Sequence, residues 1–190
     1  MLVLFFAVYL QLAAASGNVP TLADLVEALN TTEKVWLILR SYDLYWQEPY
    51  DRRNCVYVEK NSFTQDAYNF TQHYITDGEK KTLQLRAKLL QKNRPVMNVI
   101  LKPGRPNVKY TLRSWNKEHK CGLLMFKDNN EMHCEMYAWD SKVVDLNVTS
   151  SNSCEDEYDN ICKKQRKYDG NAYQCQRALN PPEPPAPACR

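Results

Sequence analysis

The segment HCEMYAWD, at residues 133–140, carries the residue types most able to bind a charged small molecule. It alternates with the period of a β-strand, so Glu135, Tyr137 and Trp139 share one face, while Cys134 belongs to the other. A carboxylate flanked by aromatic rings attracts an organic cation by ion pairing and cation–π contact. Two plainer interpretations stay open: Glu135 lies in water at a rim or pairs with a lysine or arginine, and the aromatic residues pack a core.

Other reactive residues give no signature of catalysis or metal binding. His73, His119 and His133 are isolated, without the paired spacing of a zinc site or a catalytic triad. No glycine pattern for phosphate binding occurs among the five glycines, and Cys121 has no marked partner. We therefore expect a protein that is not an enzyme, with no catalytic residues, no metal and no cofactor.

Composition and charge indicate one soluble domain. The chain has 190 residues, of which 44% are hydrophobic, enough for one substantial core. Its 25 basic and 22 acidic residues are scattered, with a formal net charge of +3, and give no stripe for binding phosphates. Nucleic acid is therefore not an expected partner.

The N-terminal residues predict export. Residues 1–16, MLVLFFAVYLQLAAAS, form an apolar run that ends in small residues, typical of a signal peptide and too short to span a membrane. Secretion permits disulfides among the seven cysteines and makes the sequons at Asn30, Asn69 and Asn147 candidate glycosylation sites. We expect an extracellular protein with one folded domain over 17–180 and a proline-rich tail over 181–190.

The remaining pattern predicts a mainly β fold with helices at both ends. Thr21 is a candidate N-cap for a short amphipathic helix, which we expect to plug or cap another element. Short strand-like runs follow from Lys34 to Asn147, with turns at 76–79, 102–107, 127–131 and 140–142. Short hairpins favour an up-and-down, eight-stranded antiparallel barrel, with a two-sheet sandwich as the alternative.

The region after these strands predicts a second helix and a final short segment. Residues 153–170 begin with a candidate cap at Ser153, carry acids first and bases last, and end at Gly170. The run NAYQCQRAL at 171–179 is expected to return to the barrel wall.

Three quoted segments resemble the tick salivary lipocalins, a family that includes the histamine-binding proteins. They are NCVYV at 54–58, HCEMYAW at 133–139 and CEDEYDNI at 154–161, together with the 21-residue step from Cys154 to Cys175. The resemblance implies a lipocalin barrel with a C-terminal helix packed outside, and disulfides Cys134–Cys154 and Cys55–Cys175. We further expect Cys162–Cys189, which would pin the tail to the helix, and an unpaired Cys121.

The implied disulfide between Cys134 and the outer helix determines where the side chain of Glu135 points. If Cys134 is bonded to a helix outside the barrel, alternation turns Glu135 into the interior. The segment SYDLYWQEPYD at 41–51 resembles the aromatic and acidic ligand-contact loop of the family. We expect the ligand-binding residues to be Glu135, Tyr137, Trp139, Trp36, Tyr42, Asp43, Trp46, Tyr110 and Leu112.

Two ligand classes compete at this stage. Histamine binders of the family carry carboxylates on the strand that here reads CGLLMF, at 121–126, where this chain has none, and Asp145 alone represents their late acidic strand. An apolar wall favours a lipid or sterol instead, formed by Leu123 or Leu124 and Met125 or Phe126, with Val56, Val58, Leu83, Leu85 and Leu112. A filled core without a cavity is the remaining alternative.

The sequence thus predicts a secreted, monomeric lipocalin that sequesters a small host mediator, a biogenic amine or a lipid, and so modulates inflammation or immunity. The alternative is an immunomodulator that binds a host protein through its loops, with the barrel as a scaffold.

Overall fold

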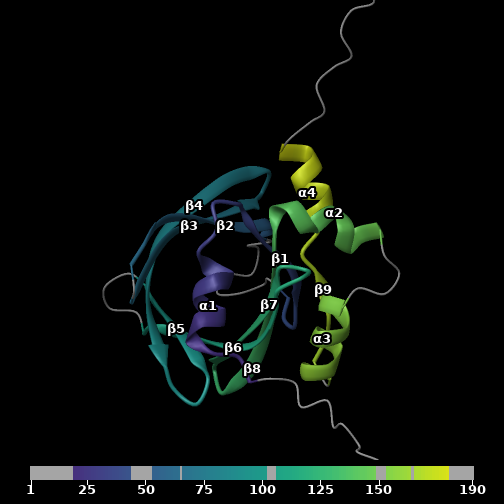
Figure 1. Ribbon diagram of the computed structural model, residues 1–190. Helices are drawn as coiled ribbons and strands as arrows, with labels where there is room; N and C mark the ends of the chain where they lie inside the picture. The colour runs from purple at the N-terminus through teal and green to yellow at the C-terminus, as the bar shows by residue number, and fades with distance from the viewer. Residues whose placement is uncertain are drawn as a thin grey trace, which may run out of the picture.

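The computed structural model describes residues 19–43, 53–64, 66–101, 106–148, 153–163 and 165–179 (Figure 1). The expected signal peptide at 1–16 and proline-rich tail at 181–190 lie outside these ranges, as do Trp46 and Cys189. None of the helices in the described ranges is long and apolar enough to cross a membrane.

Eight antiparallel strands form a closed up-and-down barrel. Consecutive strands pair along the chain, and β1 pairs with both β8 and β2, which closes the ring. The barrel is therefore confirmed, and the two-sheet sandwich is excluded. The strands are β1 (Val35–Arg40), β2 (Asn54–Phe63), β3 (Ala67–Thr76), β4 (Glu79–Gln91), β5 (Pro95–Ile100), β6 (Val108–Asn116), β7 (Cys121–Asp128) and β8 (Glu131–Trp139).

The tight hairpins follow from residues that tolerate positive φ. Asp77 and Gly78 join β3 to β4 with φ of 50° and 77°. Asn129 and Asn130 join β7 to β8 with φ of 43° and 69°. Two successive left-handed residues match the twist of the flanking strands, and Asn, Asp and Gly reach this conformation at the lowest cost.

Helix α1 (Leu22–Leu29) closes one end of the barrel, within the ring of strands in Figure 1. Thr21 caps it, since its hydroxyl accepts from the Asp24 amide while the Asp24 carboxylate accepts from the Thr21 amide at 2.8 Å. The apolar side of α1 faces inward, and the Trp139 indole N–H donates to the Ala28 carbonyl at 3.0 Å. The expected plug is therefore present.

The elements after β8 cover the outside of the barrel, and two of their boundaries differ from expectation. Residues 140–142 do not form a turn but begin α2 (Asp140–Val148). The helix expected over 153–170 ends early, as α3 (Ser153–Ile161), because Cys162 is bonded to the barrel and β9 (Tyr168–Asp169) pairs with β1. Gly170 is needed for close approach, since a Cβ there would lie 2.0 Å from the Leu37 carbonyl oxygen.

The final run forms helix α4 (Ala172–Leu179), which packs against the barrel wall. Its Ala172 and Cys175 are buried beside Trp36 and Tyr57 on the outer faces of β1 and β2. The expected return of this segment to the wall is therefore observed.

One of the expected disulfides is present and two are wrong. Cys55 is bonded to Cys175, as the resemblance implies. The expected Cys134–Cys154 and Cys162–Cys189 bonds are replaced by Cys121–Cys154 and Cys134–Cys162, so Cys121 is not a free thiol.

Matching lengths explain this pairing. Cys121 and Cys134 both face outward, and the register, with Met125 opposite Cys134, sets them four residues apart along neighbouring strands, about 13 Å. Cys154 and Cys162 are eight residues apart along α3, about 12 Å of helix. The helix therefore lies along the strands with one disulfide at each end.

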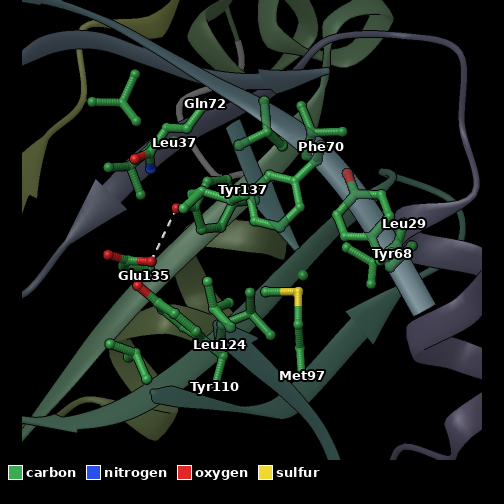
Figure 2. A pocket seen from close by; sticks show the side chains of 18 of the residues that line it. Leu29, Leu37, Tyr68, Phe70, Gln72, Met97, Tyr110, Leu124, Glu135 and Tyr137 are labelled. Carbon is green, nitrogen blue, oxygen red and sulfur yellow. Dashed lines mark hydrogen bonds between the residues drawn. The ribbon is translucent and has the colours of Figure 1, made fainter. Parts of the chain in front are cut away.

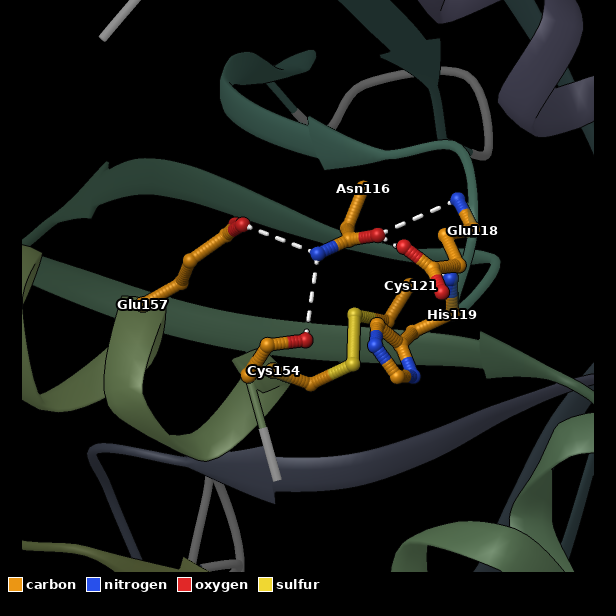
Figure 3. Close-up of a disulfide and its surroundings, with 7 residues drawn as sticks. Asn116, Glu118, His119, Cys121, Cys154 and Glu157 are labelled. Carbon is orange, nitrogen blue, oxygen red and sulfur yellow. Dashed lines mark hydrogen bonds between the residues drawn. A yellow bond between two sulfur atoms is a disulfide. The ribbon is translucent and has the colours of Figure 1, made fainter. Parts of the chain in front are cut away.

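Polar contacts fix the beginning of α3 beside the first of these disulfides (Figure 3). The Asn116 amide, at the end of β6, donates to the Ser153 hydroxyl at 3.1 Å and to the Glu157 carboxylate at 3.3 Å. The Asn116 carbonyl accepts from the amides of Glu118 and His119. One side chain thus joins the β6–β7 turn to the helix.

The pairing predicts the stability of two double variants. Cys121→Ser/Cys154→Ser removes one bond that spans 33 residues and should lower the free energy of unfolding by about 3 to 4 kcal/mol, measured by urea denaturation. Cys134→Ser/Cys154→Ser breaks two bonds and should cost more. If the second variant were the more stable one, the pairing would be refuted.

Candidate ligand-binding cavity

The barrel encloses a cavity of about 320 Å³. Inward residues of the strands line it, with Leu25, Ala28 and Leu29 of α1 at the closed end. The volume lies at the lower end of the range for sites that hold a small organic molecule. A filled core without a cavity is therefore excluded.

Most of the wall is apolar, as the strand pattern predicts. The expected residues on the wall are Val56, Val58, Leu83, Leu85 and Leu112, and Leu124 joins them. Leu123 and Met125 instead pack outside with the residues of α3. Phe126 is buried against the rings of Tyr42 and Tyr110, with centroids 5.7 and 4.9 Å away.

Glu135 points into this cavity from β8. Its side chain lines the cavity, and the residue is 3% exposed, so it does not lie in water at a rim. The inward direction expected from the tether is thus observed, although the bond partner of Cys134 is Cys162 rather than Cys154. Cys154 and Cys162 both belong to the segment that packs outside the barrel. With either partner, Cys134 faces outward and alternation turns Glu135 inward.

Tyrosine hydroxyls surround the Glu135 carboxylate (Figure 2). Tyr42 donates to one oxygen, and Tyr137 donates to the other at 3.0 Å. Figure 2 shows the Tyr110 hydroxyl directed toward the same carboxylate. Within the described ranges, the carboxylate oxygens accept hydrogen bonds from Tyr42 and Tyr137 and not from a lysine or arginine.

Burial and neighbouring groups act in opposite directions on the Glu135 carboxyl. Loss of water raises its pKa above the ordinary value. The hydrogen bonds from Tyr42 and Tyr137 lower the pKa, as does the charge of Arg40, a buried residue opposite Glu135 in the β1–β8 pairing. The net direction is upward, so this carboxyl takes up a proton more readily than an exposed one.

The structure separates the expected ligand residues into three groups. Glu135, Tyr137, Trp139, Tyr42, Tyr110 and Leu112 line the cavity together. Trp36 does not, because Val35 and Leu37 take the inward positions of β1; Trp36 packs on the outer wall and donates to Asp140 at 2.5 Å. Asp43 is exposed and away from the lining, and Trp46 lies outside the described residues.

The expected glycosylation sites lie on or near the surface where they are described. Asn30 is exposed at the end of α1, and its carbonyl accepts from the Lys60 ammonium at 2.9 Å. Asn69 is half-buried and donates to Ser62 at 2.8 Å. The side chain of Asn147 is outside the description. Their glycosylation stays a prediction.

Sequence reasoning missed part of the lining. Tyr68, Phe70 and Gln72 alternate along β3 and line the cavity, as does Met97 from β5. The same period-two reading that identified Glu135 could have found them in AYNFTQHY, at 67–74. The Tyr68 hydroxyl and the Trp115 indole N–H, both from the lining, are buried without a hydrogen-bond partner among the described residues.

The arrangement suits binding rather than chemistry. One end offers a carboxylate with three tyrosines, and most of the remaining lining is apolar or aromatic, with Arg53, Gln72 and Asp128 as its polar members. The cavity therefore matches a molecule with an apolar body and one polar end. The lining residues in the described part of the chain include no histidine and no cysteine. No group of three His, Cys, Asp or Glu side chains in the described ranges is arranged to hold a metal ion.

The sequence matches the family described as "Tick histamine binding protein" over residues 17–177. A search of curated proteins finds no match. Among solved structures, japanin from Rhipicephalus appendiculatus bound to cholesterol is similar, with a TM-score of 0.53 and 15% identity over 75% of this chain and 93% of that one. AM182 in complex with serotonin gives 0.57 and 12% over 81% and 91%. These likenesses show the shared lipocalin-like fold.

Glu135 predicts how stability depends on pH. Because its pKa is higher in the folded than in the unfolded chain, the folded state binds more protons between the two values, and the free energy of unfolding falls as pH rises through that window. Glu135→Gln removes this loss, so it should gain stability relative to the wild type at neutral pH and not at acidic pH. Urea denaturation across this range tests it, with exposed Glu131→Gln as the control.

Proposed function

Because this chain belongs to the tick histamine-binding protein family, we propose that it is a secreted protein that sequesters a small amine with an apolar body. The observation that carries the proposal is the buried Glu135 carboxylate at one end of a mainly apolar cavity. An ammonium group placed there replaces lost water with an ion pair, and the rings of Tyr42, Tyr110 and Tyr137 add cation–π attraction.

The charge count favours one ammonium group rather than two. Glu135 and Asp128 are the acids in the lining, and Arg53 also lines it. Asp128 lies at the β7–β8 turn, seven residues from Glu135 along the chain. Among the described residues, a compact dication would therefore find one buried carboxylate and no second one beside it. A monoamine with an aromatic ring fits the charge and the apolar wall together.

A lipid or sterol is the second candidate, supported by the extent of the apolar wall. Leu29, Phe70, Met97 and Leu112 offer no hydrogen bond to a ligand. With its raised pKa, Glu135 in the protonated form can donate to a hydroxyl group at the end of such a ligand. Native mass spectrometry of protein from a eukaryotic host, before and after organic extraction, separates a retained lipid from a titratable amine.

Removal of a host mediator from tissue is how such binding would damp inflammation or immunity. The pre-formed cavity supports this role, since a rigid site avoids the cost of ordering on binding. The alternative, a host protein bound by the loop at 41–51, depends mainly on residues outside the described ranges and stays a prediction.

The proposal predicts the effect of one substitution on two kinds of ligand. Glu135→Gln keeps the side-chain shape and should weaken serotonin binding about ten- to hundredfold, because a charged hydrogen-bonded pair is lost. Binding of indole, which lacks the amine, should change little. Calorimetric titration measures both, and Glu131→Gln is the control. Equal losses for serotonin and indole would contradict an ion pair with Glu135.

The same pair predicts a pH dependence. An ammonium ligand favours the ionised carboxylate, so serotonin affinity should fall as pH drops through the raised pKa of Glu135. Glu135→Gln should abolish this dependence. A sterol-like ligand would show no such fall. An amine affinity that stays constant from neutral to acidic pH would count against the proposed site.

A further inference from the structure

The basic residues of this chain are concentrated in one continuous stretch. Between residues 80 and 117 there is no Asp or Glu, while eleven lysines and arginines occur there. The expectation that basic and acidic residues are scattered along the whole chain is therefore wrong for this stretch. The rest of the chain has more acidic than basic residues. The eleven are Lys80, Lys81, Arg86, Lys88, Lys92, Arg94, Lys102, Arg105, Lys109, Arg113 and Lys117.

The fold places most of these residues on one outer surface. On β4, Leu83, Leu85, Ala87 and Leu89 face inward, so the even-numbered residues between them face solvent. Asn98 faces out from β5, and Lys109, opposite it, faces out from β6. Arg113 follows on β6 at the bulge between Leu112 and Ser114, and Lys92 and Arg94 lie in the β4–β5 turn, where Arg94 donates to the Arg113 carbonyl. We call Arg86, Lys88, Lys92, Arg94, Lys109 and Arg113 the basic face.

The register brings three of these charges close together. Lys88 lies opposite Asn98, and Asn98 lies opposite Lys109, so the two lysines are two strand spacings apart, about 10 Å. Arg86 is two residues from Lys88 on β4, about 7 Å along the strand. All three are exposed.

The basic face is not neutralised by carboxylates of the described chain. Lys81 pairs with Glu79, and Lys117 pairs with Asp24 and Glu27, but neither lysine belongs to the basic face. The ion pairs in the described ranges involve none of its six members. Burial lowers the pKa of Arg113, and the charge of nearby Arg94 lowers it further.

Helices cover the opposite wall of the barrel, and no described helix covers this wall. Helices α2, α3 and α4 lie on one side in Figure 1, against β1, β7 and β8, while β3, β4 and β5 are bare on the other side. The outward residues under α3, such as Met136 and Leu123, are fully buried and apolar. The basic face is therefore open to a partner.

We propose that the basic face binds a sulfated polysaccharide chain. Repeated sulfate and carboxylate groups along an extended polymer complement a cluster of ammonium and guanidinium groups that form no ion pair within the described ranges. The outward residues among the charges are mixed: Gln84, Asn98 and Thr111 offer polar groups to hydroxyl and sulfate oxygens, while Leu90, Val96 and Ile100 are apolar. An extracellular protein meets such chains on cell surfaces and in tissue matrix.

The composition of the same surface argues against the other polyanions. No aromatic side chain faces outward from β4 or β5, whereas single-stranded nucleic acid is held by stacking on aromatic rings. Membrane-surface binding likewise relies on an apolar side with Trp, Phe or Leu, and Leu90 is the one large exposed apolar side chain of these strands.

The test compares two triple variants with the same change in net charge. Arg86→Gln/Lys88→Gln/Lys109→Gln neutralises the centre of the basic face, and Lys127→Gln/Lys163→Gln/Arg177→Gln neutralises exposed residues elsewhere. Surface plasmon resonance on immobilised heparin should show affinity about ten- to hundredfold weaker for the first variant and near wild type for the second. Wild-type affinity should fall as salt is raised.

Control ligands complete the experiment. Chemically desulfated heparin should bind far more weakly than heparin. Equal losses in both triple variants, equal binding to desulfated heparin, or tighter binding to a single-stranded oligonucleotide or phosphatidylserine vesicles would each overturn the proposal. Both triple variants should retain thermal stability and cavity binding of serotonin or indole, so this test is independent of the function proposed for the cavity.

Discussion

The structure depends on one constraint, the attachment of the outer side of β7 and β8 to α3. Cys121 and Cys134 are bonded to Cys154 and Cys162, at the two ends of the helix. A shift of β8 by one residue would turn Cys134 into the barrel and bury Glu135 under α3. The disulfides and the apolar residues beside them therefore determine that Glu135 faces inward. Its position follows from its neighbours on the strand.

That position creates an electrostatic cost that the protein offsets only in part. Hydrogen bonds from Tyr42 and Tyr137, and the charge of Arg40, favour the ionised carboxylate, but burial still raises its pKa. A lysine fixed beside Glu135 would have lowered the pKa of this carboxyl further. It would also have neutralised the negative charge, so the site would no longer attract a cation. This incomplete compensation supports the proposed attraction of Glu135 for a cationic ligand.

The sequence predicted best where one face of a strand differs from the other. In β8 alternation separated Glu135 from Cys134, and the disulfide of Cys134 implied by the family resemblance then gave the inward direction. The turn at Asn129 and Asn130 was visible from residue type. β1 and β7 have apolar residues on both faces, because helices cover one and the cavity adjoins the other. Alternation of residue types then cannot distinguish the inner from the outer face. For this reason Trp36 was wrongly predicted to contact the ligand, and the choice between Leu123 and Leu124 for the cavity wall stayed open. Disulfide pairing required the distance along α3, which appears only after the end of that helix is known.

The barrel separates charges of opposite sign on two surfaces. Glu135 lies inside, on the wall covered by helices, whereas Arg86, Lys88 and Lys109 lie outside on the bare wall. At physiological ionic strength an exposed charge is screened within about 8 Å, so the basic face exerts little force on a cation that approaches the end of the barrel. A polyanion bound there would neutralise even this residual repulsion. The two surfaces can therefore be occupied together, and a barrel held on an extracellular polymer would keep its cavity free for a cationic ligand.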